Sequence, residues 1–349
     1  MKKAVEAQTA GQPDKVCDQI VDAIVDEYLK RDPTARIDLK ALGSHGMLMI
    51  GGEVTSNADF DLSALAKAVY RDIGYADDIE VFVNIDKQSP QMRSMTHGSA
   101  DTVIAHGYAT AETRERLPVA VVFAQTIARR LDDLRRADPA FSWLQPDGKA
   151  QLVLEKDRVV AVTILASHAP SIQPRDVQTA ILERVVSPIV GQDGVRILIN
   201  PIGPFTQCGF AADSGVSGQC TASDTYGGLI PSGDLSLCGR DPLRAERAGT
   251  YMARMAARYI VDQGLAASAM VSAVYSLGIS EPVHIHAVGL GEKSRGTKMD
   301  LTNLIKQQFD FRPEAIVERL QLRRPLYRAV SLYGQFGRPE LPWEESAAA

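Results

Sequence analysis

Four residues near the start of the chain bring an amide, a carboxylate and an ammonium to the first turn of an expected helix. The sequence Gln12-Pro-Asp-Lys15 follows Gly11 and precedes a run with helical periodicity. Unpaired backbone N–H groups at a helix N-terminus attract anions, so an aspartate beside a lysine can hold a metal-bound anion there. Proline followed by aspartate is also ordinary sequence for the start of a helix. The stretch therefore predicts anion chemistry only if other segments supply matching groups.

Three further short segments carry charged side chains next to glycine or proline. Gly51–Glu53 is typical of a turn with a solvated acid, and Pro146–Lys149 is typical of a hairpin turn. Asp224–Gly228 fits any glycine-rich loop. None of the three establishes a function on its own.

The segment Gly239–Arg247 is the most highly charged of these stretches. Asp241 is expected to cap a helix that begins directly after it, because aspartate accepts hydrogen bonds from the first free N–H groups of a helix. Arg240 and Arg244 are four residues apart and can form one basic edge, while Glu246 can pair with a neighbouring cation. This segment alone does not settle a function either.

Secondary structure must position these segments, and strand-like runs alternate with amphipathic helices almost throughout the chain. We expect helices at residues 16–30, 61–74, 117–136, 174–190, 243–264 and 299–309. We expect strands at residues 46–53, 79–85, 151–156, 158–167, 195–200, 267–276 and 282–289. The helix at 61–74 should end at Gly74, and the strand at 46–53 should be buried and end in a Gly-Gly turn.

Three rounds of sheet plus covering helices predict an α+β fold of three similar modules. The expected boundaries are 1–97 for an N-terminal module, 98–210 for a central module and 211–349 for a C-terminal module. The Gly- and Ser-rich stretch from Asn200 to Gly239 has little periodicity. Long stretches of this kind in compact proteins are usually functional.

Composition restricts the class of protein. The 349 residues carry a formal net charge of −5 with a pI near 5.8, which argues against general nucleic-acid affinity. The cysteines show no CxxC spacing, as in a reduced cytosolic enzyme, and they are Cys17, Cys208, Cys220 and Cys238. No apolar run reaches about 18 residues and the start lacks a signal-peptide core, so we expect a cytoplasmic protein without membrane association.

Taken together and in order, these segments resemble those of the S-adenosylmethionine synthetase (methionine adenosyltransferase) family. The resemblance runs from Glu6 to Glu345 and includes DPTARI, GMLMIGGE, KQSP, HGYATAET, WLQPDGKAQ, NPIGPF, DTYGG and LRRPLYRAVSLYGQFGRPELPWE. It implies three modules around a pseudo-threefold axis, and a homodimer or dimer of dimers with active sites between subunits. It also implies the family's reaction, in which the methionine sulfur attacks C5′ of ATP and expels tripolyphosphate, which is then split to phosphate and diphosphate.

The resemblance implies roles for individual side chains around the two substrates. The residues that match the family's grip on methionine are Glu53, Gln88 and Asp213. Phe205 matches the ring that stacks on adenine. The carboxylates that match groups near the nucleotide are Glu6, Asp101 and Asp147, the last two near the ribose and the methionine.

A highly charged leaving group must be held by cations, so Lys, Arg and Mg²⁺ should gather around the polyphosphate. The matching side chains are Lys15, Lys149, Arg240 and Arg244, with the two arginines standing where the family has lysines. Asp14 matches a magnesium ligand, and Glu246 stands where the family has an aspartate ligand. The resemblance thus implies Mg²⁺ as the cofactor.

Three further departures from the family pattern affect the expected site. Gln12 replaces a histidine that donates to the departing oxygen, and a glutamine carries no positive charge. Lys40 replaces a glutamate that binds potassium, so either its ammonium stands in for that ion and K⁺ is not required, or it is an ordinary surface lysine. Gln219 and Cys220 replace an Arg-Lys pair on the polyphosphate. Because a charge-assisted hydrogen bond contributes about 1.5–3 kcal/mol, the double loss costs roughly 3–6 kcal/mol, or about 10²–10⁴ in rate or affinity.

The methionine and adenosine ends of the expected site are thus kept, whereas the polyphosphate end has lost cations. This pattern suggests a specialised relative whose leaving group or reaction direction differs. The first interpretation is nevertheless a methionine adenosyltransferase that uses ATP and methionine, because four cationic side chains remain and Arg240 and Arg244 can each bind a pair of phosphate oxygens. Two alternatives stay open. One is a specialised relative that acts on a related nucleotide, a related sulfur compound, an adenosyl sulfonium or polyphosphate. The other is a non-catalytic homologue that binds a ligand or regulates an active partner.

Overall fold

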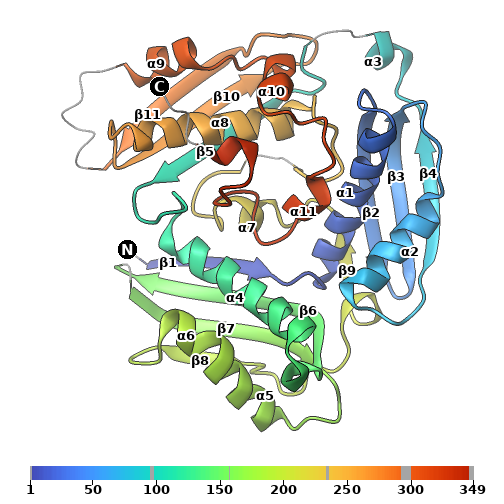
Figure 1. Cartoon of the computed structure of the whole chain (residues 1–349), viewed down its shortest axis with the longest axis vertical. Coiled ribbons are helices and arrows are strands. Elements are labelled where there is room, and N and C mark those ends of the chain that lie inside the picture. The colour runs from blue at the N-terminus through green and yellow to red at the C-terminus, as the bar shows by residue number, and fades with distance from the viewer. Residues whose placement is uncertain (1, 95–97, 157, 233–235, 292–299, 346–349) are drawn as a thin grey trace.

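The computed structural model describes residues 2–94, 98–156, 158–232, 236–291 and 300–345. Three separate β-sheets carry the fold (Figure 1). The central sheet has the strand order β1 (Lys2–Gln8), β6 (Leu144–Glu155), β7 (Arg158–His168) and β8 (Arg196–Ile199). The C-terminal sheet has the order β11 (His284–Leu290), β10 (Ser268–Tyr275) and β5 (Val103–Thr110). The N-terminal sheet has the order β4 (Glu80–Asp86), β3 (Met47–Thr55), β2 (Arg36–Ser44) and β9 (Ser214–Val216).

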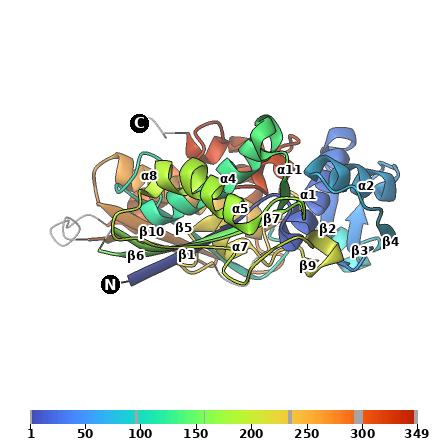
Figure 2. The same ribbon diagram turned by 90° about the horizontal axis from the view of Figure 1, so that it is seen from below.

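The long helices α1, α2, α4 and α8 lie on one side of these sheets (Figure 2). The helices are α1 (Pro13–Arg31), α2 (Leu62–Ile73), α3 (Pro90–Ser94), α4 (Val119–Ala137), α5 (Pro174–Ile181), α6 (Ser187–Val190), α7 (Thr221–Thr225), α8 (Ala245–Asp262), α9 (Leu301–Gln308), α10 (Pro313–Arg319) and α11 (Tyr327–Val330). A π-helical turn (Leu182–Val186) joins α5 to α6, and short 3₁₀ turns span Pro139–Phe141, Gly209–Ala211 and Pro342–Glu344. Across the described ranges, no helix combines the length and the apolar character needed to cross a membrane.

Each sheet combines strands from distant parts of the chain. β1 pairs with β6, which places Glu6 opposite Gln151. β9 adds to the edge of β2, and β5 pairs with β10. Neighbouring strands are antiparallel except for the parallel pairs β3–β4 and β7–β8. The predicted α+β fold of three sheets with covering helices is confirmed. The module boundaries stay a prediction. Every sheet draws strands from two of the expected modules.

The helix expected at residues 16–30 is α1, and its sequence explains where it starts and which of its residues are buried. Pro13 occupies the first turn, where its missing N–H is not needed. The expected apolar stripe is buried, and it consists of Val16, Ile20, Ile24 and Tyr28. α1 packs against β2, α2 and α11, so it is covered on several sides. Its N-terminus is thereby held in one place by tertiary contacts.

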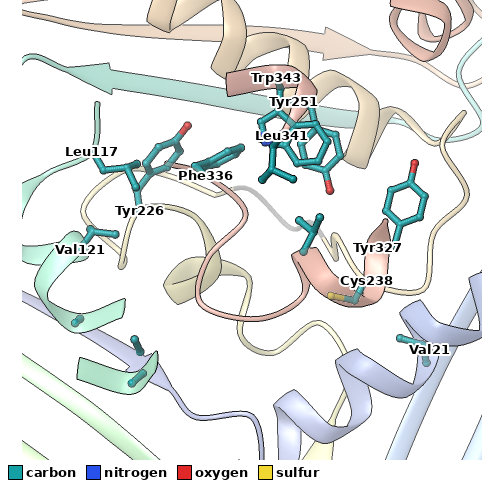
Figure 3. Close-up of a cluster of buried hydrophobic side chains, with 14 of the residues drawn as sticks. Val21, Leu117, Val121, Tyr226, Cys238, Tyr251, Tyr327, Phe336, Leu341 and Trp343 are labelled. Atoms are coloured by element: carbon teal, nitrogen blue, oxygen red, sulfur yellow. The ribbon is translucent and has the colours of Figure 1, made fainter. Parts of the chain in front are cut away.

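An aromatic core links α8 to the last described part of the chain (Figure 3). Trp343 is fully buried and stacks on Tyr251 of α8, with ring centroids 3.6 Å apart. Phe336 stacks in turn on Tyr226 at 5.1 Å. The family motif near the end of the chain is therefore part of the core that holds α8 and the segment after α7 together.

Two expected turns lie inside strands instead. Pro146–Lys149 is part of β6, because Thr9 N donates to Gly148 O at 3.0 Å and the segment pairs with β7 beyond an irregularity between Leu144 and Gly148. Gly51 and Gly52 lie within β3, since its register with β2 continues to Thr55. The expectation of a turn was wrong in both places because paired neighbouring strands supply hydrogen bonds that override local turn preference.

The expectation of full burial was wrong for β3, where Met47 and Met49 are about half exposed on one face. The expected cap of α8 was also wrong. α8 begins at Ala245, and Asp241 instead accepts hydrogen bonds from Leu243 N and from Ile37 N in β2, each at 2.8 Å. The carboxylate of Asp241 thus attaches the segment before α8 to the N-terminal sheet.

Candidate active site

The N-terminus of α1 holds an amide and a carboxylate in contact. Gln12 is the residue before the first turn, and its Oε1 accepts a hydrogen bond from Lys15 N at 3.1 Å. Its Nε2 donates to Asp14 Oδ2 at 3.0 Å, and Asp14 Oδ1 accepts from Val216 N at 2.8 Å. Gln12 therefore caps the helix and orients Asp14.

Two glycines allow distant segments to approach this helix end. Gly11 N donates to Pro146 O at 3.0 Å, and a Cβ on Gly11 would lie 2.4 Å from the Pro146 side chain. A Cβ on Gly215 would lie 2.2 Å from the backbone of Pro13. Only glycine fits at these two contacts, which join β6 and β9 to the start of α1.

Lys15 points into the protein and is 1% exposed. Its Nζ lies 3.0 Å from Asp18 Oδ2 and 2.7 Å from Asp224 Oδ2, and both partners are buried. Burial lowers the pKa of Lys15, but the two carboxylates more than offset this effect and hold the pKa well above its usual value. Asp18 and Asp224 form a possible cation site with Cys238, and the ammonium of Lys15 already binds two of those three groups.

Asp147 of β6 belongs to the same region. It is buried, and its Oδ2 accepts a hydrogen bond from Gly209 N at 2.9 Å. Burial raises the pKa of Asp147 to about 7, and repulsion from Asp213 and Asp14 adds to the rise. Three of the predicted site carboxylates are therefore close enough to influence one another.

The residues at the two replaced cation positions differ in exposure. Gln219 is exposed, whereas Cys220 is buried, with its Sγ 4.0 Å from Gln12 Oε1. Burial raises the pKa of the Cys220 thiol. A thiol in this state is a poor nucleophile, because the thiolate is the reactive form.

Three more predicted residues belong to the central sheet or contact it. Lys149 pairs with Glu6 across β6 and β1, with Nζ and Oε2 2.8 Å apart, and both side chains are partly exposed. Phe205 is half-buried, and its backbone exchanges hydrogen bonds with His168. We call the residues gathered around the start of α1 the α1 group, and they are Glu6, Gln12, Asp14, Lys15, Asp147, Lys149, Phe205, Asp213, Gln219 and Cys220.

A second group of charged residues lies at the start of α8. Arg240 pairs with Asp38 of β2, and Arg244 Nη2 lies 3.1 Å from the other oxygen of the same carboxylate. Arg244 Nη1 also lies 3.8 Å from Asp101 Oδ2. Glu246 is 3% exposed, and its Oε2 has no hydrogen-bond partner within the described residues. Burial raises the pKa of Glu246 to about 7, against the opposing pull of Arg240 and Arg244.

The N-terminal sheet brings two more predicted residues near this second group. Lys40 and Glu53 line one groove together with Asp38. Glu53 lies directly opposite Asp38 in the register of β3 and β2, and Lys40 lies opposite Gly51. We call Asp38, Glu53, Asp101, Arg240, Arg244 and Glu246 the α8 group. Within the part of the chain that the structure describes, no hydrogen bond or ion pair joins this group to the α1 group.

Gln88 lies after β4, where it is 2% exposed and its Oε1 has no hydrogen-bond partner among the described residues.

Sequence reasoning missed three residues that contact predicted ones, namely Asp18, Asp38 and Asp224. Asp18 lies three residues after Lys15 and so one turn along the same helix face, a spacing that was readable. The other two depend on contacts between distant segments.

Comparisons with known proteins cover nearly the whole chain. Three family models match in order, described as the N-terminal, central and C-terminal domains of S-adenosylmethionine synthetase, at residues 3–90, 96–205 and 208–345. The S-adenosylmethionine synthase of Sorangium cellulosum is 37% identical over 99% of this chain and 87% of its own. Those of Desulforudis audaxviator and Aquifex aeolicus are 36% and 33% identical, over 97% and 98% of this chain and 94% and 96% of their own.

Proposed function

We propose that this chain, which belongs to the S-adenosylmethionine synthetase family, forms S-adenosylmethionine from methionine and ATP. The thioether sulfur of methionine would attack C5′ of ATP. The C5′–O bond would break, and its electron pair would leave with tripolyphosphate while the sulfur becomes a sulfonium. Water would then split the tripolyphosphate into phosphate and diphosphate.

The observation that carries this proposal is the convergence of three distant segments on the N-terminus of α1. Asp14 accepts hydrogen bonds from Gln12 and Val216, and Asp147 lies close enough for Asp14 to raise its pKa. The helix N-terminus presents the positive end of the helix dipole, which suits a phosphate. These features support binding of the nucleotide at the α1 group.

The roles of the other predicted residues are part of the same proposal. Phe205 is half-buried and still presents part of its ring, which suits stacking on adenine. The buried Oε1 of Gln88, which has no partner within the described ranges, is free to accept a hydrogen bond from the methionine ammonium. Glu53 and Asp213 would supply carboxylates for the same ammonium.

Mg²⁺ is proposed as the cofactor, with Asp14 and Glu246 as its carboxylate ligands. The residues fit this role, because Glu246 Oε2 is buried without a hydrogen-bond partner in the described structure and carboxylate oxygens suit this hard cation. When bound, the metal would neutralise charge that develops on the leaving polyphosphate.

We also propose that the active unit is a homodimer. The face of the N-terminal sheet away from α1 and α2 carries an apolar patch whose side chains are about half exposed, at Leu42, Met47, Met49 and Phe82. Exposed apolar patches of this kind mark interaction surfaces. Among the described residues no hydrogen bond or ion pair joins the α1 group to the α8 group, which supports sites that combine the two groups from different subunits.

Sedimentation tests the dimer directly. Wild-type protein should sediment as a dimer or larger. Met49→Lys should shift it towards monomer, because a charge at the centre of a buried apolar face is costly. Ala64→Lys on the exposed side of α2 is the matched control and should leave the assembly unchanged. A wild-type monomer with full activity would rule out the dimer.

A cytoplasmic location belongs to the same proposal, because all four cysteines are free thiols and a reducing compartment preserves that state.

The activity is tested by incubating the protein with ATP, methionine and Mg²⁺ and identifying the products by mass spectrometry. The expected products are S-adenosylmethionine, phosphate and diphosphate. Polyphosphate hydrolysis alone, turnover of a different nucleotide only, or no product in any combination would contradict the proposal.

A further inference from the structure

The segment before α8 runs alongside β2 like an additional strand. Leu39 N donates to Gly239 O at 2.8 Å, and Asp241 N donates to Ile37 O at 3.1 Å. Asp38 and Arg240 form an antiparallel bridge between these hydrogen bonds and therefore lie directly opposite each other. Side chains at such paired positions are neighbours on the same face.

The carboxylate of Asp38 divides its two oxygens between two arginines. Oδ1 contacts Arg240, and Oδ2 lies 3.1 Å from Arg244 Nη2. The arginine side chains are 10% and 5% exposed, and that of Asp38 is 26% exposed. The contacts with Asp38 are made by Arg240 Nη1 and Arg244 Nη2, which are outer nitrogens of the kind that a phosphate would also use.

The charges that face this arginine pair are mostly negative. Asp38 contacts both guanidinium groups, and Asp101 approaches Arg244 at 3.8 Å. Glu246 is a third carboxylate, two residues after Arg244 in the first turn of α8, and Asp241 is a fourth that interacts with Arg244. Two cations therefore face four carboxylates, so the pair is not a free positive site for a large anion.

We propose that Asp38 is a specificity-determining residue, an inference that rests on the proposed function. Its carboxylate acts as an internal counter-anion of Arg240 and Arg244 and lowers the affinity of the α8 group for free polyphosphate. A phosphate oxygen that binds Arg240 Nη1 or Arg244 Nη2 has to share that nitrogen with Asp38. Free tripolyphosphate also meets direct repulsion from that carboxylate, whereas a magnesium-complexed triphosphate carries less negative charge. The pair thus favours the metal-bound nucleotide over the free anion.

The test measures binding of sodium tripolyphosphate by calorimetry in metal-free buffer with EDTA, at constant ionic strength. Asp38→Asn should bind tripolyphosphate roughly tenfold or more tightly than wild type, because one negative charge close to the anion is removed. Asp38→Glu keeps the charge and should bind like wild type. The matched control is Asp78→Asn, since Asp78 also pairs with two basic side chains, Lys67 and Arg71, but lies on an exposed surface.

A gain in affinity separates this role from a merely structural one, because a protein that has lost its local structure would bind the anion more weakly. Asp38→Ser is a second neutral variant should Asp38→Asn fail to fold. Unchanged or weaker binding in a folded neutral variant would overturn the inference. The activity assay is independent: if wild type makes no S-adenosylmethionine while Asp38→Asn binds tripolyphosphate more tightly, the proposed function fails and the inference stands.

Discussion

Replacing Lys15 with methionine is expected to destabilise the whole protein. The ammonium lies 3.0 Å from Asp18 and 2.7 Å from Asp224, and all three side chains are at least nine-tenths buried. Methionine fits the volume of the lysine stem but leaves two buried carboxylates without a cation. Breaking a buried ion pair in this way costs about 3–5 kcal/mol of unfolding free energy, which corresponds to a fall in melting temperature on the order of 10 °C.

The loss should depend on pH in a defined direction. Burial raises the pKa of Asp224 to about 7, and Lys15 opposes that rise, so the pKa rises further in the variant. A carboxyl group with a higher pKa in the folded than in the unfolded state contributes stability that is complete below its unfolded pKa and is lost as pH rises through its folded pKa. The stability of Lys15→Met should therefore continue to fall above pH 7, where the contribution of Asp224 in wild type levels off, by up to about 1.4 kcal/mol per pH unit for one proton.

Thermal unfolding across that pH range measures the effect. Lys67→Met is the control, because Lys67 pairs with Asp78 at the surface and such pairs contribute about 1 kcal/mol or less. Activity should be lost only in proportion to the unfolded fraction. A variant that melts like wild type but turns over at least about a hundredfold more slowly would refute this reasoning, because Lys15 would then act on the substrate.

Three further results are expected. Asp14→Asn should lower metal-dependent turnover roughly a hundredfold or more while the fold is kept, because it removes a proposed metal ligand; normal turnover would place the metal elsewhere. The rate of wild type should be equal in sodium and potassium buffers of the same ionic strength, and Lys40→Glu should create potassium dependence; a severalfold rise of the wild-type rate with K⁺ would exclude the substitution of ammonium for potassium. Gln219→Arg should tighten tripolyphosphate inhibition about tenfold through one charge-assisted hydrogen bond, with the exposed Gln192→Arg as control; unchanged inhibition would show that this segment does not face the anion.

Much of the fold was predictable because helices reveal themselves locally. α1, α2, α4 and α8 lie where the 3.6-residue period placed them, and Gly74 ends α2 as expected. β2 was missed although Ile37, Leu39 and Ala41 alternate with Asp38 and Lys40, which is the pattern of a half-buried strand. That signal was present in the sequence. The exchange of β1, β5 and β9 between sheets was not predictable, because it pairs segments that are far apart in the chain and leaves no local pattern.

The candidate site was likewise predictable only in part. Family motifs predicted which residue types would gather, and Gln12 and Asp14 do contact each other. The oppositely charged partners of the predicted site residues became known only from the structure. Asp38 meets Arg240 through a register between β2 and a segment about 200 residues later. The spacing of residues within either segment holds no information about that register.

The pairing of charges at the candidate site says more about phosphate binding than the number of cations in the sequence does. Each predicted phosphate-binding cation is paired with a carboxylate in the described structure: Lys15, Lys149, Arg240 and Arg244. Lys15 is fully buried, and free tripolyphosphate would have to compete with those carboxylates for Lys149, Arg240 and Arg244. A nucleotide that arrives with Mg²⁺ brings its own positive charge, and the carboxylates then become ligands or partners of the metal instead of competitors. The loss of the Arg-Lys pair at residues 219 and 220 fits a site of this kind, in which metal ions supply charge that side chains do not.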